Sequence, residues 1–200
     1  MARIIGPKCR MCRRSGVKLY LKGTRCDSDK CSLNKRPYAP GQHGNARSRK
    51  SEYGLQLREK QKAKWTYGVL ERQFRKYVTR AMESKGITSE NLYRILESRL
   101  DNVIFRSGLA VSRAQARQMA RSGLFMINDK VVKTPSHAVQ PGDVIKAVDF
   151  SKVHLREGFI LPDWIGANVK GRYITYDRYP TLEDFNGNYE IQSIIDFYSR

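Results

Sequence analysis

The pattern of apolar and polar positions between residues 99 and 122 predicts two short helices separated by a turn. Gly108 interrupts the pattern, and Ser112 can cap the second helix by accepting a hydrogen bond from a free backbone N–H. Gly123 suits the left-handed residue that ends a helix. The apolar positions that would pack these two helices together are Leu100, Val103, Ile104, Ala116, Met119 and Ala120.

After Gly123 the apolar positions alternate, which predicts short strands. Phe125 and Ile127 form one strand, and Asn128-Asp129 turns the chain back as a tight hairpin, although the favoured Asn-Gly pair is absent. Turns at Pro135 and at residues 141–143 frame further short strands. A unit that spans only residues 99–145 is a binding module, too small to enclose an active site.

The rest of the chain divides into helical and strand-like stretches. Helical patterns begin at Glu52, continue over residues 70–81 after Gly68, and return in a helix capped by Ser89 and in a short helix at 189–198. Residues 150–164 and 172–179 alternate enough to suggest strands. We therefore expect an α+β protein with a basic arm (residues 1–50), a mainly helical first domain (51–97) and a small domain of two helices and β-hairpins with a β-rich extension (98–188).

Charge is concentrated in the first part of the chain. The net charge is +19 and the isoelectric point is near 10.0, which indicates a polyanionic partner. Residues 1–80 carry 22 Lys and Arg against 5 Asp and Glu, whereas residues 81–200 carry 16 against 14. No apolar run is long enough for a membrane span, and no apolar signal segment precedes the arm, so a cytoplasmic location is expected.

Arg113, Arg117 and Arg121 recur at four-residue spacing and form one side of the predicted second helix, here named the arginine ridge. No acidic residue lies four positions away from any of them. A solvated helix face is the simpler interpretation, but like charges on one ridge repel, which favours binding to an anion. The wider set of candidate RNA-binding residues comprises Arg3, Lys8, Arg13, Arg14, Lys35, Arg36, Arg47, Arg49, Lys50, Arg58, Lys62 and Arg72.

All four cysteines lie in the basic arm, as two close pairs separated by a loop: Cys9, Cys12, Cys26 and Cys31. Four thiolates at this spacing can hold one structural zinc ion, and the neighbouring cations would favour the thiolate form. Disulfides, four free thiols and an iron–sulfur cluster are the alternatives. His43 could replace one ligand.

Several motifs carry a resemblance to a known family. RLDNV at 99–103, the Ser-Arg-x-x-Ala-Arg-Gln step at 112–118, Pro135-Ser136 and Gly142-Asp143 resemble the RNA-binding domain named after small-subunit ribosomal protein four. MARIIGPKCRMCRR at the start, PGQHG at 40–44, SEYGLQLREKQKAKW at 51–65 and the final IIDFYSR resemble the rest of that bacterial family. The resemblance spans essentially the whole chain, with one departure at Asp129, where the family more often has glycine.

The resemblance implies a non-enzymatic structural protein of the small ribosomal subunit that binds small-subunit rRNA and nucleates subunit assembly. It also implies contact with ribosomal protein five, a place near the path by which mRNA enters, an influence on translational accuracy and repression of its own mRNA. The C-terminal helix at 189–200 would pack on the first domain. No membrane or small-molecule substrate is expected.

Two other classes of function compete with this interpretation. An RNA-modifying enzyme often carries a similar small RNA-binding module, and Asp101 in RLDN resembles a catalytic aspartate. Such an enzyme needs a further catalytic domain, whereas Asp101 on a helix can simply pair with Arg99 or Arg106. A zinc-containing DNA-binding regulator could place the helix at 113–121 in a major groove, but nothing indicates the dimer symmetry that such proteins commonly use.

Overall fold

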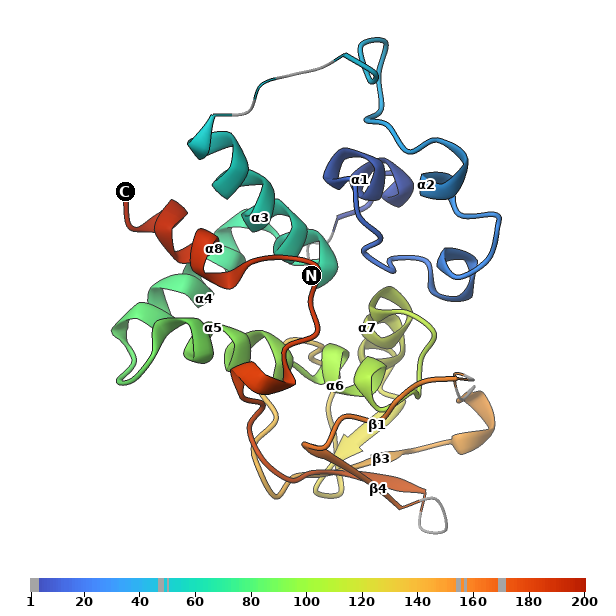
Figure 1. Cartoon of the computed structure of the whole chain (residues 1–200). Coiled ribbons are helices and arrows are strands. Elements are labelled where there is room, and N and C mark those ends of the chain that lie inside the picture. Colours follow the sequence, from blue (N-terminus) through green and yellow to red (C-terminus); the bar gives the residue numbers. More distant parts are fainter. Residues whose placement is uncertain (1–3, 47–48, 50, 154–155, 157, 169–171) are drawn as a thin grey trace. The chain divides into compact units, whose positions relative to one another are not determined.

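The computed structural model describes residues 4–46, 49, 51–153, 156, 158–168 and 172–200. The chain forms two compact units, coloured along the sequence in Figure 1. The first unit contains Met1–Leu92 and Asn186–Arg200, and the second contains Tyr93–Phe185. The boundary lies inside a helix, five residues before the expected start at 98, and the basic arm belongs to the first unit.

The first unit is helical. Its elements are α1 (Lys8–Ser15), the 3-10 turn η1 (Gly23–Cys26), α2 (Ser32–Lys35), α3 (Glu52–Thr66), α4 (Glu71–Glu83) and α8 (Ile191–Tyr198). Helix α5 (Thr88–Glu97) crosses the boundary between the units. It begins at Thr88, so Ser89 lies in its first turn and is not the cap that the sequence predicted.

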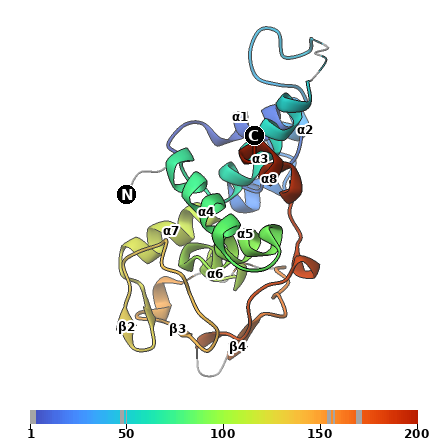
Figure 2. The same cartoon turned by 90° about the vertical axis from the view of Figure 1, so that its left-hand side faces the viewer.

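The C-terminal segment completes the first unit, where α8 lies beside α3 (Figure 2). Ile191 and Ile194 are buried, in keeping with the apolar side expected for this helix. The hydroxyls of Tyr67 and Tyr189 are 2.9 Å apart, and Asn188 donates a 2.7 Å hydrogen bond to the carbonyl of Lys18 in the basic arm. The last residues of the chain therefore join α3 and the arm.

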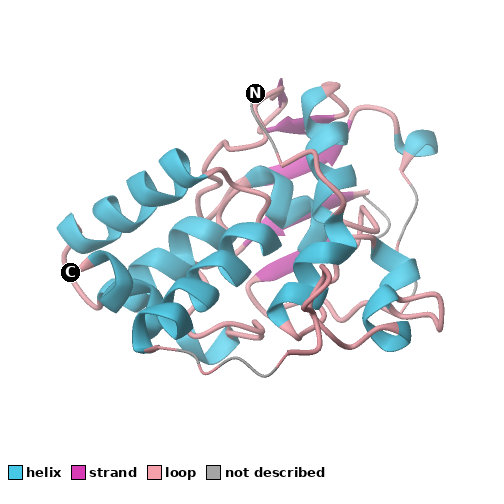
Figure 3. Cartoon of the chain, turned by 90° about the horizontal axis from the view of Figure 1, so that it is seen from above, coloured by secondary structure: helices cyan, strands magenta, loops and turns pink. Residues whose placement is uncertain are grey.

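The second unit combines two helices with one antiparallel sheet. Its elements are α6 (Leu100–Arg106), α7 (Arg113–Arg121), β1 (Phe125–Ile127), β2 (Lys130–Val131), β3 (Val144–Ala147), η2 (Phe150–Lys152), β4 (Ile165–Asn168), β5 (Tyr173–Tyr176) and η3 (Leu182–Asp184). The strand order is β2-β1-β3-β5-β4. Figure 3 distinguishes these strands from the helices, and the mixture is the expected α+β class.

Helices α6 and α7 share one hydrophobic core with the sheet. All six apolar positions predicted to join the two helices are buried in it, together with Phe125, Ile145 and Ile174 from the strands. Trp164 and Tyr176 also belong to this core, and their rings meet edge to face with the ring centroids 5.5 Å apart. The strand predicted over 150–164 is wrong: η2 and an irregular segment occupy the described part of that range, and β4 begins only at Ile165.

The β1–β2 hairpin shows why glycine is dispensable at its turn. Asn128 and Asp129 both have positive φ, 47° and 66°, as both central residues of a type I′ turn require. Asparagine and aspartate tolerate this left-handed region better than other side chains. The Asn128 amide also bonds to Asp143 at 2.7 Å and to the backbone N–H of Val144 at 3.0 Å, which fixes the turn against β3.

No helix among the described residues is both long and apolar enough to cross a membrane.

Candidate nucleic-acid interface

Helix α7 carries the arginine ridge and begins as its sequence predicts. The Ser112 hydroxyl accepts a hydrogen bond from the backbone N–H of Gln115 at 3.3 Å, and Gly123 has a positive φ of 79° just beyond the end of the helix. Ala116 and Ala120 face the core with no exposed area. Their burial leaves the arginines on the sides of α7 that are not occupied by the sheet.

The ridge is not a row of equivalent solvated cations. Arg117 lies 3.3 Å from the carboxylate of Asp101, and Arg121 alone of the three is exposed. Arg113 donates a 2.7 Å hydrogen bond from Nε to Asn102 and stacks over the Phe105 ring at 4.4 Å. As the sequence indicates, α7 itself provides no acidic partner for the ridge. The neighbouring helix α6 provides one, Asp101, to Arg117.

Asp101 has a structural role that the sequence only partly revealed. Its side chain is 5% exposed and accepts two hydrogen bonds from Arg99, at 3.0 Å from Nε and 2.6 Å from Nη2. The predicted pairing with Arg99 is thus present, whereas Arg106 pairs with Glu97 instead, at 2.8 Å. A carboxylate shared by two arginines is a clamp on α6 and α7.

The basic arm contains a second cluster of cations. Arg25, Lys30, Ser32, Lys35 and Arg36 line one open pocket, and its four cationic side chains are exposed. Lys35 and Arg36 are members of the predicted RNA-binding set, but Arg25 and Lys30 are not. No motif in the sequence marks Arg25 or Lys30 as a binding residue, and only the fold of the arm brings all four cations together.

The other arm residues differ in what surrounds them. Arg14 and Arg49 are exposed. Arg13 instead holds the arm together: it stacks over the Tyr38 ring at 5.0 Å and donates to the carbonyls of Tyr38 and Ala39. Lys8 is half-buried beside the cysteines. The predicted residues Arg3, Arg47 and Lys50 lie outside the described residues.

Helix α4 presents an exposed basic surface, the α4 basic face, which consists of Arg72, Arg75, Lys76 and Arg80. These side chains line an open pocket between two carboxylates of the same helix, those of Glu71 and Glu83. Arg72 was in the predicted set. On α3, Arg58 is half-buried, and Lys62 is paired with Glu59 at 2.6 Å, so neither is a freely solvated cation.

The four cysteines line one small pocket in the arm, and three of them are buried. Burial raises the pKa of the Cys12 and Cys26 thiols, and backbone N–H groups of Leu19 and Lys22 only partly offset it. Burial, and not a neighbouring cation, therefore has the largest effect on the pKa of these two thiols. In the described part of the chain, no group of three or more His, Cys, Asp or Glu side chains is arranged to hold a metal ion.

Comparison with known proteins places these features in a family. Residues 3–97 match the ribosomal protein S4/S9 N-terminal domain, and residues 98–145 match the S4 domain. The small ribosomal subunit protein uS4 of Thermotoga petrophila is 47% identical over 214 residues, and that of Natranaerobius thermophilus is 50% identical over 212 residues. In both cases 100% of each chain is covered.

A third relative, the small ribosomal subunit protein uS4A of Clostridium botulinum, is 48% identical over 206 residues, again with both chains fully covered. An S4 domain that follows the S4/S9 N-terminal domain defines a class of ribosomal proteins. The chain belongs to the small ribosomal subunit protein uS4 family, as its motifs indicated.

Proposed function

We propose that this chain is a structural, non-enzymatic component of the small ribosomal subunit that binds small-subunit rRNA directly. The observation that supports this proposal most strongly is the full-length similarity of the chain to proteins named small ribosomal subunit protein uS4. Net charge of +19 and the three basic surfaces described above agree with a polyanionic partner. Neither the RNA-modifying enzyme nor the DNA-binding regulator draws support from these relatives.

Phosphate contacts supply most of the proposed affinity. The A-form helices of RNA offer few readable base edges in their deep major groove, so a protein recognises them through shape and backbone. The arginine ridge, the arm pocket and the α4 basic face would each contact phosphates on folded rRNA. A helical junction is the expected target because it brings several backbones within reach of one protein.

A titration tests this function. The chain is titrated against purified small-subunit rRNA, with a structured RNA of equal length as competitor, over a series of salt concentrations. Preference for the rRNA that persists at moderate salt supports recognition of shape. Equal binding to both RNAs, lost steeply as salt rises, would reduce the chain to a charge-driven binder and contradict the proposal.

For the arm, we propose one structural zinc ion held by Cys9, Cys12, Cys26 and Cys31. The donor chemistry fits: four sulfur atoms line one pocket, and the backbone N–H of Lys22 already points to Cys26 Sγ at 3.4 Å. Among the described residues these side chains do not yet form a metal site, so metal binding would have to rearrange them. Zinc would ionise the thiols that burial keeps protonated, and an iron–sulfur cluster is the alternative occupant.

Metal content and local order test the zinc proposal together. The purified chain should carry one equivalent of zinc by elemental analysis, with no iron and no visible absorption. Replacing Cys9 and Cys12 with Ser should abolish this zinc and raise hydrogen exchange over residues 4–40, with the second unit unchanged. The matched control Ser28→Ala, in the same loop, should keep the metal. Iron in the preparation, or an ordered arm without metal, would contradict the proposal.

The finer roles follow from the resemblance alone. They comprise nucleation of subunit assembly, contact with ribosomal protein five of the small subunit, a place near the path by which mRNA enters, an influence on translational accuracy and a ribosome-bound location in the cytoplasm. Stepwise reconstitution tests the first: omitting this chain should block the binding of later proteins to the rRNA. Normal assembly in its absence would contradict that role.

A further inference from the structure

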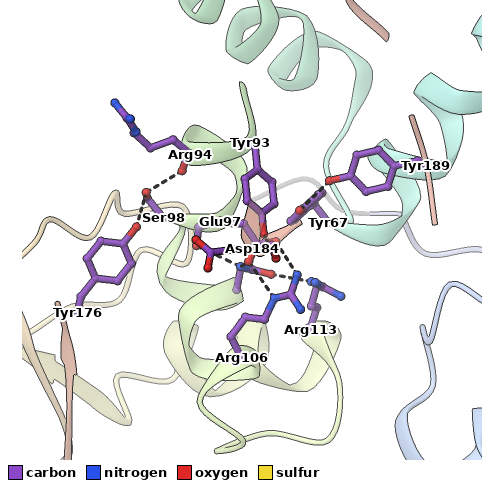
Figure 4. Close-up of polar contacts among 11 residues, drawn as sticks. Tyr67, Tyr93, Arg94, Glu97, Ser98, Arg106, Arg113, Tyr176, Asp184 and Tyr189 are labelled. Carbon is purple, nitrogen blue, oxygen red and sulfur yellow. Dashed lines mark hydrogen bonds and ion pairs between the residues drawn. The ribbon is translucent and has the colours of Figure 1, made fainter. Parts of the chain in front are cut away.

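A chain of hydrogen bonds leads from a fully buried carboxylate to the arginine ridge. Glu97, at the end of α5, has no exposed side-chain area. Arg106 donates to both of its carboxylate oxygens, at 2.8 and 3.0 Å, and Asn102 donates to Oε2 at 2.8 Å. The Asn102 carbonyl oxygen then accepts the 2.7 Å hydrogen bond from Arg113 Nε. Figure 4 shows Glu97, Arg106 and Arg113 converging in this network.

The surroundings of Asn102 allow its amide only one orientation. On one side lie two acceptors, the Glu97 carboxylate and the Glu97 carbonyl oxygen, which is 3.1 Å from Asn102 Nδ2. On the other side lies a donor, Arg113 Nε. The opposite orientation of the amide would place like partners against each other on both sides. A buried acceptor with a single direction is therefore aimed at the base of the Arg113 guanidinium.

The ring of Phe105 restrains the same guanidinium from a second direction, at 4.4 Å. Asn102 and Phe105 lie three positions apart on α6, so both present the same helical surface to α7. A hydrogen bond at Nε and an aromatic ring against the plane together restrict the rotation of a long, flexible side chain. The entropy of ordering Arg113 is then lost when the protein folds and not when it binds its ligand.

We propose that Asn102 is a positioning residue that directs the Arg113 guanidinium toward an RNA phosphate, with buried Glu97 as its anchor. This inference rests on the proposed function. It assigns Asn102 and Glu97 an effect on RNA affinity that neither exerts by touching RNA: Asn102 is 1% exposed and Glu97 is fully buried. The direction of Arg113, and not only its charge, contributes to recognition.

A double-mutant cycle on rRNA binding tests the proposal. Asn102→Ala should weaken binding about fivefold when Arg113 is present, but less than about twofold in an Arg113→Ala background. Arg113→Lys keeps the charge and loses the Nε donor, so it should weaken binding about as much as Asn102→Ala, and the two changes should not add. Where Asn102→Ala fails to fold, Arg113→Lys still overturns the inference if it binds like the wild type, and the mobility of the Arg113 guanidinium in the wild type tests the restraint directly.

Asn91→Ala is the matched control. Asn91 is also a buried asparagine, and its amide donates to three carbonyls in the last turn of α4 and just beyond it, far in sequence from the ridge. Any effect of this change on binding should be the same with and without Arg113. If Asn102→Ala behaves in this additive way, or if Arg113→Lys binds like the wild type, Asn102 serves the fold only and the inference is overturned.

The cycle also separates this inference from the proposed function. If Arg113→Ala binds rRNA like the wild type, the positioning role is overturned, while the preference of the wild-type chain for rRNA still decides the function. A spectroscopic measurement on the free protein gives a further check. Nitrogen relaxation of Arg113 Nε should show a restricted guanidinium in the wild type and in Asn91→Ala, and a mobile one in Asn102→Ala. A guanidinium that is mobile in the wild type would overturn the inference.

Discussion

The arginine ridge and the α4 basic face differ in what holds their cations. On the ridge, Arg113 and Arg117 are tied to α6 by an amide, an aromatic ring and a carboxylate. On the α4 basic face, four exposed cations have no ion pair with any described residue. The carboxylate of Glu71 at the start of α4 instead turns to Lys60 and Lys64 of α3. Helices α7 and α4 both carry several cations, but two of those on α7 are restrained by partners on α6, whereas those of the α4 basic face are exposed to solvent.

The two surfaces can therefore contribute to RNA binding in different ways, one through the direction of its hydrogen bonds and the other through its electrostatic field. A restrained guanidinium offers its hydrogen bonds in one direction and can recognise the shape of a backbone. A solvated cation contributes mainly to an electrostatic field that attracts RNA. Salt at about 0.1 M screens this field beyond about 10 Å. Counting Lys and Arg along the sequence treats both surfaces alike, whereas the structure distinguishes them.

The largest expected effect comes from breaking the clamp under the ridge. Asp101→Ala takes the shared carboxylate away from the buried Arg99 and from Arg117, so the second unit should lose about 3 kcal/mol of unfolding free energy. Urea denaturation in a Trp65→Phe background, where buried Trp164 is the remaining tryptophan, measures this loss by fluorescence. Lys152→Ala, which removes an exposed ion pair of the same unit, should leave the midpoint unchanged. A clamp variant as stable as this control would show that the ridge is no better anchored than the α4 basic face.

Removing the ridge is expected to have the next largest effect. Replacing Arg113, Arg117 and Arg121 with Ala should weaken rRNA binding by about a hundredfold, because each lost charged hydrogen bond costs about 1–2 kcal/mol and such losses are only partly additive. The salt slope should fall by about 0.7–0.9 for each lost phosphate contact. The residual affinity defect should persist at high salt. An unchanged slope would mean that the ridge is merely solvated.

The α4 basic face provides the direct counterpart. Replacing Arg72, Arg75 and Arg80 with Ala should lower the association rate with rRNA and reduce the salt slope, with a loss of about tenfold at low salt that disappears at high salt. Unfolding free energy should not change, because these side chains are exposed and unpaired among the described residues. A defect that survives high salt would place this surface in the same class as the ridge.

The smallest expected effect concerns Glu71, whose carboxylate pairs with lysines of α3 and not with the cations of the α4 basic face. Glu71 accepts hydrogen bonds from Lys60 at 2.8 Å, Lys64 at 2.8 Å and Tyr198 at 2.6 Å. Partial burial would raise its pKa, but these three donors outweigh burial and lower the pKa from 4.5 to about 2. Because the folded pKa lies below the unfolded value, the stabilisation is complete above pH 4.5 and is lost as the pH falls toward 2.

Glu71→Gln should therefore cost the first unit about 1 kcal/mol at neutral pH, a figure reduced for the exposure of this side chain. The difference from the wild type should shrink as the pH is lowered from 5 to 2. Thermal unfolding across this pH range measures it, with Glu83→Gln as the exposed control on the same helix. A constant difference at all pH values would show that the carboxylate charge contributes nothing.

Local chemistry explains why parts of both surfaces could be predicted. The Ser112 cap, the Gly123 stop and the apolar positions of α6 and α7 follow from contacts within one or two helical turns, and the structure contains all of them. The Asn128-Asp129 turn also follows from its own residues. The arm cluster of Arg25 and Lys30 with Lys35 and Arg36 could not be predicted, because it depends on the path of an irregular loop.

The family, the excess of positive charge in the first 80 residues and the spacing of the arginines along α7 could all be predicted before the fold was known, because they depend on motifs, composition and helical periodicity. Which cations have partners depends on the packing of the helices. Asp101 is sixteen residues from Arg117, and Asn102 is eleven from Arg113. These contacts depend on how the shared hydrophobic core fixes the two helices side by side, and the apolar pattern that predicts the packing of the helices does not say which polar side chains meet.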